Sequence, residues 1–374
     1  MRILFTGPAS QGHIFPMVPF AQGLRAAGHE VLFAGQPPLD PMLTAGFPVV
    51  RIGDGRTLEE LFTDWRDAPP MRYGNADLSH DELMDMAAAG FAYACRNTLD
   101  DLLTTAADWR ADLLVHATFQ TVAPLVAAKL KIPLVMQNYG IPSGRDMVAR
   151  FTGKLADLYE RHGVAGPAES TAINVGPIGG DPDGLRARYV PYNGTGLVPL
   201  EALRRPSERR RVLVTLGSVV TRLEGLGGVT RLIENAAEVD ADFLLAVGDA
   251  DTSTLGTLPS NVIPTPWTPL IELVRHVDAV VHHGGAGTTL TTLNEGLPQL
   301  VLPQGADNFV VAAALSEAGI ALTSTSDTVD TATLDRLLTD ADLRSAATSV
   351  RAANHALPTP ASFVPTLEGL TARA

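Results

Sequence analysis

Residues 267–308, WTPLIELVRHVDAVVHHGGAGTTLTTLNEGLPQLVLPQGADN, hold the pattern that decides the fold of this chain. A short apolar run at 278–281 is followed by two histidines and a glycine-rich segment, and a helix-like segment then ends at Gly296. A second apolar run follows at 299–303. The order strand, glycine turn, helix, strand predicts one βαβ unit whose loop lies at the carboxyl end of a strand.

The glycine loop, residues 283–288 (HGGAGT), directly follows the first of these strands. Its glycines, Gly285 and Gly287 among them, let the backbone approach a ligand closely, and free N–H groups at the start of a helix favour an anion. The His283 ring and the Thr288 hydroxyl can add hydrogen bonds. We therefore expect the glycine loop to bind a phosphate or diphosphate.

Residues near both ends of the stretch extend the predicted site. Trp267 follows a strand candidate at 261–263 and offers a flat face for a nucleobase, and we expect Thr268 beside it at the same site. Asp307 and Asn308 lie at the end of the next strand, from which they can reach sugar hydroxyls. The whole stretch thus favours a ligand that combines a base, a diphosphate and a sugar.

Length and composition limit the class of protein. A chain of 374 residues is expected to form two domains, and 45% hydrophobic residues with 34 glycines suit an α/β protein with buried parallel strands. A net charge of −13 argues against nucleic acid or an anionic membrane as the main partner. The single cysteine, Cys95, excludes an internal disulfide. With neither a signal-peptide pattern nor an apolar run of about 20 residues, a cytoplasmic enzyme is expected.

The pattern of strands and helices divides the chain into two halves. Strand candidates lie at 3–5, 29–34, 111–116 and 132–137 in the first half, and at 211–216 and 243–247 before the βαβ unit in the second. Both halves read as doubly wound, with sites at the carboxyl ends of their strands. We expect domains at 1–195 and 211–357, a linker at 196–210 and a last helix within 358–374.

The βαβ stretch resembles the donor-binding signature of family 1 glycosyltransferases, which have the GT-B fold and use nucleoside-diphosphate sugars. The plant signature runs from a Trp through His-Cys-Gly-Trp-Asn-Ser to Asp-Gln, and this chain keeps Trp267, His283, Gly285, a hydroxyl at Thr288, Asp307 and an amide at Asn308. The antibiotic-glycosylating bacterial branch, with HHGGAGT…G.PQ..LP.GAD, is more similar. The resemblance extends to MRILFTGPASQGHIFP, VPYNGTG and RRVLVTLGS.

The resemblance implies a division of labour between two Rossmann-like domains that face each other across a cleft. The first domain would bind the acceptor and the second the nucleotide sugar, with the last helix packing back on the first domain. Ser218, after the strand at 211–216, matches a family contact near the diphosphate and the reacting sugar. A plain strand-to-helix turn is the alternative for Ser218.

His13 matches the family's general base, which takes the proton of the acceptor. An imidazole suits this work because its ordinary pKa is about 6.5, although a histidine that only bonds its own loop is the alternative. Ser10 would help to position the acceptor or sugar, or would only bond the loop. Relatives orient this histidine with an aspartate after the strand at 111–116, where this chain reads VHATFQ. Asp307, His116 and Thr118 remain as candidate partners.

Two departures from the family pattern bear on the substrates. Plant relatives carry a ribose-binding glutamate where this chain has Thr291, which favours deoxyribose and hence a dTDP-sugar. Asn308 in place of the usual Gln favours a deoxysugar with fewer hydroxyls. The missing aspartate near His13 favours a phenolic acceptor, which needs less help to lose its proton.

The acceptor pocket is expected in the variable segment between Asp54 and Arg96, with Trp65, Tyr73 and Met86 as candidate contacts. Pliable Met and aromatic side chains suit a planar polyketide. Ordinary packing of a helix around 83–93 explains many of these residues equally well.

No metal site is expected. His282 and His283 are adjacent at a strand end and so point in opposite directions. Asp249 and Asp251 resemble the Asp-x-Asp metal motif of a different glycosyltransferase fold, but they read better as a solvated turn.

Taken together, the residues and the resemblance predict an inverting, metal-independent transferase that moves a deoxysugar from dTDP to a hydroxyl of an antibiotic aglycone. It is most similar to angucycline-type enzymes such as landomycin-type olivosyltransferases. The expected partners are the aglycone and the nucleotide sugar as co-substrate, with no further cofactor, and a homodimer is an option. The alternatives are a catalytically silent helper of a partner transferase and a nicotinamide oxidoreductase, although HHGGAGTTL does not match G-x-G-x-x-G.

Overall fold

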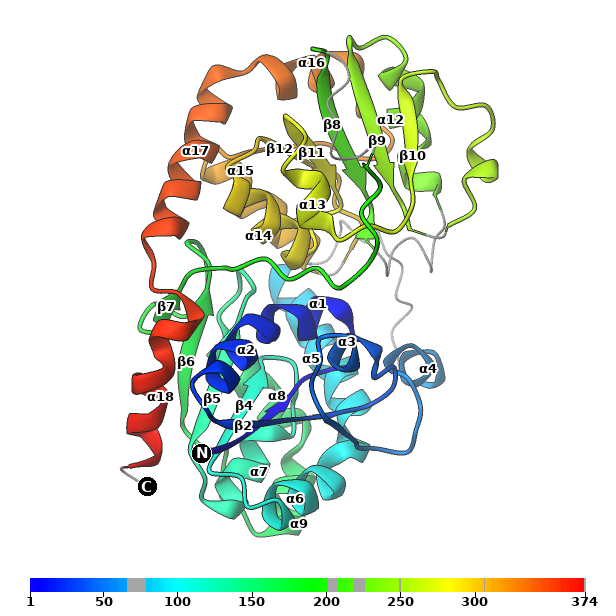
Figure 1. Ribbon diagram of the computed structural model, residues 1–374. Coiled ribbons are helices and arrows are strands. Elements are labelled where there is room, and N and C mark those ends of the chain that lie inside the picture. The colour runs from blue at the N-terminus through cyan, green and yellow to red at the C-terminus, as the bar shows by residue number, and fades with distance from the viewer. Residues whose placement is uncertain (66–78, 201–207, 218–225, 249, 306, 373–374) are drawn as a thin grey trace. The chain divides into compact units, whose positions relative to one another are not determined.

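The computed structural model describes residues 1–65, 79–200, 208–217, 226–248, 250–305 and 307–372 (Figure 1). They form two compact units. The first unit contains the described residues up to 194 together with 357–372, and the second contains those from 195 to 356.

The first unit is built on a parallel sheet of seven strands in the order β3-β2-β1-β4-β5-β6-β7. The strands are β1 (Arg2–Thr6), β2 (Glu30–Gly35), β3 (Val49–Arg51), β4 (Leu113–Ala117), β5 (Leu134–Asn138), β6 (Ser170–Val175) and β7 (Leu185–Ala187). β4 and β5 are buried along their whole length, as expected for strands covered on both faces.

Helices cover the faces of this sheet (Figure 1). They are α1 (Gln11–Ile14), α2 (Val18–Ala26), α3 (Asp40–Leu43), α4 (Leu58–Asp64), α5 (His80–Cys95), α6 (Leu99–Asp108), α7 (Ala123–Leu130), α8 (Gly144–Lys154), α9 (Ala156–His162) and the C-terminal α18 (Val364–Thr371). α4 and α5 each begin with a capping box, in which Thr57 or Ser79 exchanges hydrogen bonds with the glutamate three residues later. The variable segment is therefore largely helical where it is described.

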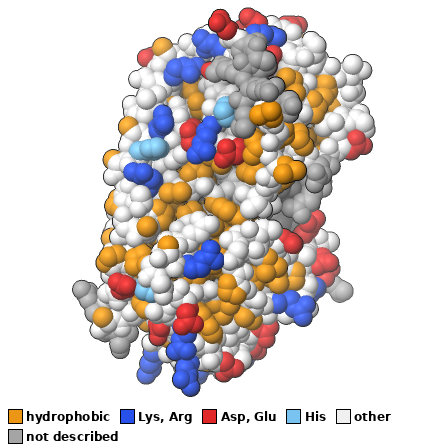
Figure 2. Space-filling view, in the orientation of Figure 1, with side chains coloured by type: hydrophobic (Ala, Val, Ile, Leu, Met, Phe, Trp, Pro, Cys, Tyr) orange, Lys and Arg blue, Asp and Glu red, His pale blue; other side chains and the backbone are white. Residues whose placement is uncertain are grey.

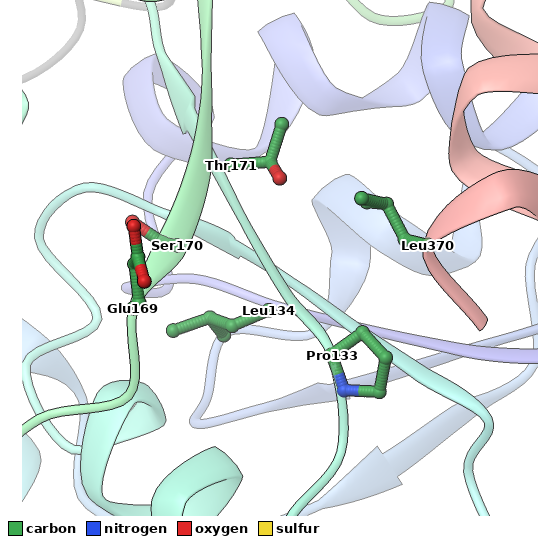
Figure 3. Close-up of a pocket in the computed structure, with 6 residues that line it drawn as sticks. All are labelled: Pro133, Leu134, Glu169, Ser170, Thr171 and Leu370. Atoms are coloured by element: carbon green, nitrogen blue, oxygen red, sulfur yellow. The ribbon is translucent and has the colours of Figure 1, made fainter. Parts of the chain in front are cut away.

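The C-terminal segment packs on the first unit. The Phe363 ring lies 5.7 Å from that of Phe20 in α2, the Arg188 amide donates to the Pro358 carbonyl at 2.8 Å, and His29 pairs with Glu368 at 3.2 Å. Leu370 of α18 also lines a small pocket of about 240 Å³ together with Leu134 and Ser170, the first residues of β5 and β6 (Figure 3). This pocket lies at the amino ends of the strands, away from the edge where α/β sheets place their ligands.

The second unit repeats the plan with a parallel sheet of six strands in the order β10-β9-β8-β11-β12-β13. The strands are β8 (Arg210–Thr215), β9 (Ala241–Ala246), β10 (Val262–Thr265), β11 (Ala279–His282), β12 (Gln299–Val301) and β13 (Ala321–Thr323). The α-helices described in this unit are α12 (Thr230–Ala236), α13 (Leu270–Val274), α14 (Ala286–Glu295), α15 (Asn308–Glu317), α16 (Thr331–Thr339) and α17 (Ala341–Ala356).

Each sheet reverses its strand order at one point, between β1 and β4 in the first unit and between β8 and β11 in the second. Loops that leave such a pair at its carboxyl end diverge to opposite faces, and ligands bind where they part. His13 follows β1, and the glycine loop follows β11. The prediction of two doubly wound units is confirmed. Both sets of candidate residues lie at these reversal points.

On the face shown in Figure 2, acidic and basic side chains are interspersed and hydrophobic side chains lie between them. None of the described helices is both long and apolar enough to cross a membrane.

Candidate active site

The His283 ring is held between two glycines. A Cβ added to Gly217, after β8, would lie 2.5 Å from Cε1 of His283, and one added to Gly285 would lie 2.5 Å from its Nε2. Both distances are far below van der Waals contact, so only glycine leaves room for the imidazole. Gly217 also has a φ of +71°, a conformation that favours glycine. The neighbouring strands β8 and β11 thus fix the ring at their reversal point.

His283 is neutral and offers a polar atom to a ligand. Burial, together with the neighbouring His282, lowers the pKa of His283 to about 3. Its Nδ1 is buried and has no hydrogen-bond partner among the described residues. Because buried polar atoms in proteins are almost always paired, this unpaired nitrogen distinguishes the His283 ring from an ordinary core histidine.

The start of α14 adds backbone donors. Gly285 is the N-cap residue and makes no side-chain cap, and the first internal bond runs from the Thr289 amide to the Gly285 carbonyl at 3.0 Å. The N–H groups before Thr289 therefore have no carbonyl of the helix to bind, and the helix dipole favours negative charge at this end. The half-buried Thr288 lies in this first turn. These features suit a diphosphate.

His282 and His283 contact different residues. The fully buried His282 contacts Gln299 of β12 through Nε2 at 2.7 Å, and its Nδ1 accepts the Gly284 amide at 3.0 Å. The two rings therefore do not face a common ion. The described residues contain no group of three or more His, Cys, Asp or Glu side chains that could hold a metal.

Trp267 lies at the carboxyl end of β10 with part of its ring open. The side chain is 39% exposed, its Nε1 donates to the Thr195 carbonyl at 3.3 Å, and it borders a shallow cavity of about 610 Å³. The other lining residues are Leu197, Val198, Pro199 and Pro266. This apolar hollow suits a flat base. The Thr268 hydroxyl donates to the Pro266 carbonyl at 3.0 Å and so shapes the loop that carries Trp267.

Asp307 and Asn308 lie at the start of α15, at the same edge of the sheet. The half-buried Asp307 is the N-cap residue without a side-chain cap bond, and burial raises the pKa of its carboxyl. With its amide turned so that both groups are satisfied, Asn308 donates to the carbonyls of Gly305 at 3.0 Å and His283 at 3.3 Å and so braces the glycine loop.

The Thr291 hydroxyl is hydrogen-bonded within its own helix. Thr291 is fully buried in α14, and its hydroxyl donates to the Gly287 carbonyl at 2.7 Å. At this position the helix thus presents no carboxylate and no free hydroxyl.

In the first unit, His13 is paired with a tyrosine that the sequence did not single out. Nδ1 of His13 is hydrogen-bonded to the hydroxyl of Tyr139, directly after β5. The loop of Tyr139 is fixed by Asn138, whose side chain accepts the Gly140 amide at 3.0 Å and donates to the Pro142 carbonyl at 3.0 Å. Tyr139 therefore holds the His13 ring by one nitrogen and leaves Nε2 for an acceptor.

Two of the partners left open for His13 by the sequence, His116 and Thr118, have other partners in the structure. The ring of the fully buried His116 contacts the Ala117 carbonyl at 3.0 Å, and Thr118 donates to Asn138 at 3.5 Å. Asp307 belongs to the second unit, and its role beside His13 stays a prediction. The contact between Tyr139 and His13 could not be predicted from the sequence. The position of Tyr139 directly after a buried strand could have marked it as a candidate site residue.

Aromatic rings surround His13. Its ring lies 5.4 Å from Phe91 of α5, edge to face, and 5.4 Å from Phe119, which follows β4. Burial lowers the pKa of His13 to about 4, so the ring is neutral near pH 7. The result is a weak, uncharged base in an apolar setting that suits a flat aromatic molecule.

The remaining candidates are only partly placed. Ser10 is half-buried at the N-cap of α1 and makes no cap bond. Trp65 stacks on Tyr93 at 6.1 Å, and Met86 packs on a cluster around Phe151, so both contribute to packing around α5. Tyr73, Ser218 and Asp249 lie outside the described residues.

The fold and the glycine loop define the chain as a glycosyltransferase of the GT-B class, and comparison with solved structures supports this. The chain superposes on the glycosyltransferase SnogD from Streptomyces nogalater with a TM-score of 0.82 and 34% identity, covering 99% of each chain. It superposes on the glycosyltransferase SsfS6 from Streptomyces sp. SF2575, complexed with thymidine diphosphate, with a TM-score of 0.85 and 30% identity, again over 99% of each chain.

Sequence comparison gives the family. Residues 22–217 match the N-terminal domain and residues 230–370 the C-terminal domain of the family described as erythromycin biosynthesis protein CIII-like. The elloramycin glycosyltransferase of Streptomyces olivaceus is 35% identical over 366 residues, which is 96% of this chain and 95% of that protein. The chain belongs to this family of antibiotic-biosynthesis glycosyltransferases.

Proposed function

We propose that this enzyme transfers a deoxysugar from a dTDP-sugar to a hydroxyl of an aromatic polyketide aglycone, with inversion at the anomeric carbon and without a metal ion. The observation that carries the proposal is the neutral, half-buried His283 ring, fixed between Gly217 and Gly285 at the start of α14. Such a group can donate to a diphosphate oxygen without carrying a charge of its own. The relative solved with thymidine diphosphate supports this choice of donor.

The absence of a carboxylate at Thr291 supports deoxyribose over ribose. A carboxylate that grips a 2′-hydroxyl would be left unpaired by a deoxynucleotide, at a cost of about 1–3 kcal/mol. Thr291 instead satisfies its hydroxyl inside α14. The site therefore loses nothing when the 2′-hydroxyl is missing, whereas the 2′-hydroxyl of UDP would give up its hydrogen bonds to water without gaining a partner.

In the reaction, Nε2 of His13 takes the proton of the acceptor hydroxyl while Tyr139 accepts a hydrogen bond from Nδ1–H. The acceptor oxygen forms a bond to the anomeric carbon, and the bond from that carbon to the diphosphate oxygen breaks. The electron pair leaves with dTDP, and the backbone N–H groups at the start of α14, together with His283, stabilise the added charge.

The surroundings of His13 favour an acidic acceptor. Its partner is a neutral tyrosine rather than a carboxylate, and burial lowers its pKa to about 4, so it is a weak base. A phenol needs less help than an alcohol to lose its proton, and Phe91 and Phe119 suit a flat ring system. We therefore place the acceptor among phenolic polyketides, with an angucycline as the specific candidate.

A panel of dTDP- and UDP-sugars, incubated with aromatic aglycones in the presence of EDTA, tests the proposal by mass spectrometry of the products. We expect glycosides from dTDP-deoxysugars and phenolic aglycones. Products only from UDP-sugars, or only after metal is added, would contradict it.

The second candidate is a catalytically silent protein that activates a partner transferase. An assay of glycoside formation by the purified protein alone distinguishes the two, because a silent protein forms no product without its partner. The paired His13 and the fixed His283 favour an active enzyme. The nicotinamide oxidoreductase alternative is dropped, because the matched family consists of transferases. A homodimer and a cytoplasmic location stay predictions.

A further inference from the structure

His282 has both ring nitrogens engaged at the base of the glycine loop, although the reaction as proposed does not use it. It is the last residue of β11, the central strand beside the reversal point, and it is 0% exposed. Its Nε2 lies 2.7 Å from Oε1 of Gln299, and its Nδ1 lies 3.0 Å from the amide nitrogen of Gly284. An amide N–H can only donate, so Nδ1 must be the acceptor and Nε2 must carry the proton.

The Gly284 amide is the point at which the chain turns from strand to helix. Gly284 has a φ of +97°, and a Cβ there would lie 3.1 Å from Val301 and 3.2 Å from Asn308. The bond to His282 therefore fixes the peptide between His283 and Gly284 in one orientation. That peptide determines where the His283 ring lies and where the N–H groups after Gly285 point.

We propose that His282 is a positioning residue for the donor: its Nδ1 holds the Gly284 amide, and so keeps His283 and the start of α14 oriented toward the diphosphate. This inference rests on the proposed function, since it assigns His282 a role in binding the same nucleotide. The other nitrogen, bonded to Gln299, holds the ring in the tautomer in which Nδ1 can accept.

Two substitutions separate the roles of the two nitrogens. In His282→Asn the side-chain oxygen falls where Nδ1 was and can still accept the Gly284 amide. In His282→Gln the terminal amide falls where Nε2 was, so contact with Gln299 is kept while the acceptor for Gly284 is lost. Asn261→Ala serves as the matched control, because Asn261 is also buried in the second unit and donates to the carbonyls of Ala236 and Ala241, away from the glycine loop.

Calorimetric titration with dTDP and hydrogen exchange of the ligand-free proteins are the two measurements. We expect His282→Asn to bind dTDP within about threefold of the wild type and His282→Gln about tenfold or more weakly, the effect of one misplaced hydrogen bond. Exchange across the peptide that contains the glycine loop should rise in His282→Gln alone, and the acceptor KM should not change. Asn261→Ala should lower the melting temperature without changing dTDP affinity.

The outcomes distinguish this inference from the proposed function. If the wild type does not bind dTDP, the proposed donor is wrong and the role of His282 falls with it. If the wild type binds dTDP but the Asn and Gln variants bind it equally well, only the positioning role is overturned. Equal loss of affinity in both variants, matched by equal loss of melting temperature, would make His282 an ordinary core residue.

Discussion

Gly285→Ala is the most direct test of the way in which the glycine loop holds His283. Gly285 has φ −63° and ψ 138°, which alanine adopts without strain, so the new methyl group acts only through its neighbours. It would lie 2.5 Å from Nε2 of His283, roughly 1 Å closer than ordinary contact. The ring must therefore leave the place in which Gly217 and Gly285 hold it.

A hydrogen bond lost to a charged group costs about 1.5–3 kcal/mol, so the dTDP dissociation constant should rise roughly 10- to 150-fold. A small loss of stability is expected separately, because alanine is a poorer N-cap than glycine. Gly227→Ala is the matched control, since a Cβ there meets nothing within 4 Å.

The assay is calorimetric titration with dTDP on a double-mutant cycle of Gly285→Ala and His283→Ala. If the methyl group acts through His283, the change at Gly285 should cost little once the imidazole is gone. Fully additive losses would show that Gly285 contributes by itself, through its backbone, and would refute the steric reasoning.

Four further outcomes are expected. His13→Ala should bind dTDP almost like the wild type while turnover falls by about 10²–10⁴, with a smaller fall for acidic phenols than for alcohols in a series of graded acceptors; near-normal rates on an alcohol would move the base elsewhere. Tyr139→Phe should lower turnover about tenfold and leave dTDP affinity unchanged, since it removes one hydrogen bond from Nδ1 of His13. A lower dTDP affinity would show that Tyr139 supports the structure beyond its contact with His13. Titration with EDTA present should show tighter binding of dTDP than of UDP, and equal affinities would remove the argument from Thr291. Turnover should stay level from pH 8 to about 6 and fall only as the pH approaches the lowered pKa of His13, about 4, because the neutral ring is the base; a fall centred near pH 6.5 would mean that the ring titrates like an exposed histidine.

The architecture could be predicted from the sequence because buried parallel strands are short apolar runs and because glycines and prolines mark where they end. The run at 278–281 became β11, and the helix predicted to end at Gly296 does so, with Gly296 in the left-handed conformation at its C-cap. Such signals are local, and each depends on the residues of one element.

The partners of the site residues could not be predicted, because they depend on which strands are neighbours. Tyr139 contacts His13 only because the loops after β1 and β5 lie at the same edge of the sheet, although the two residues are 126 positions apart in the sequence. His282 similarly depends on Gln299 at the start of the next strand. In the sequence, both read equally well as ordinary buried residues.

The most direct test of the central claim is the anomeric configuration of the product. Purified protein alone is incubated with an α-linked dTDP-deoxysugar and a phenolic aglycone, dTDP release is measured, and the glycoside is examined by proton NMR. Direct displacement predicts one β-glycoside formed for each dTDP released. A retained α-configuration, or no product until a second protein is added, would contradict the account.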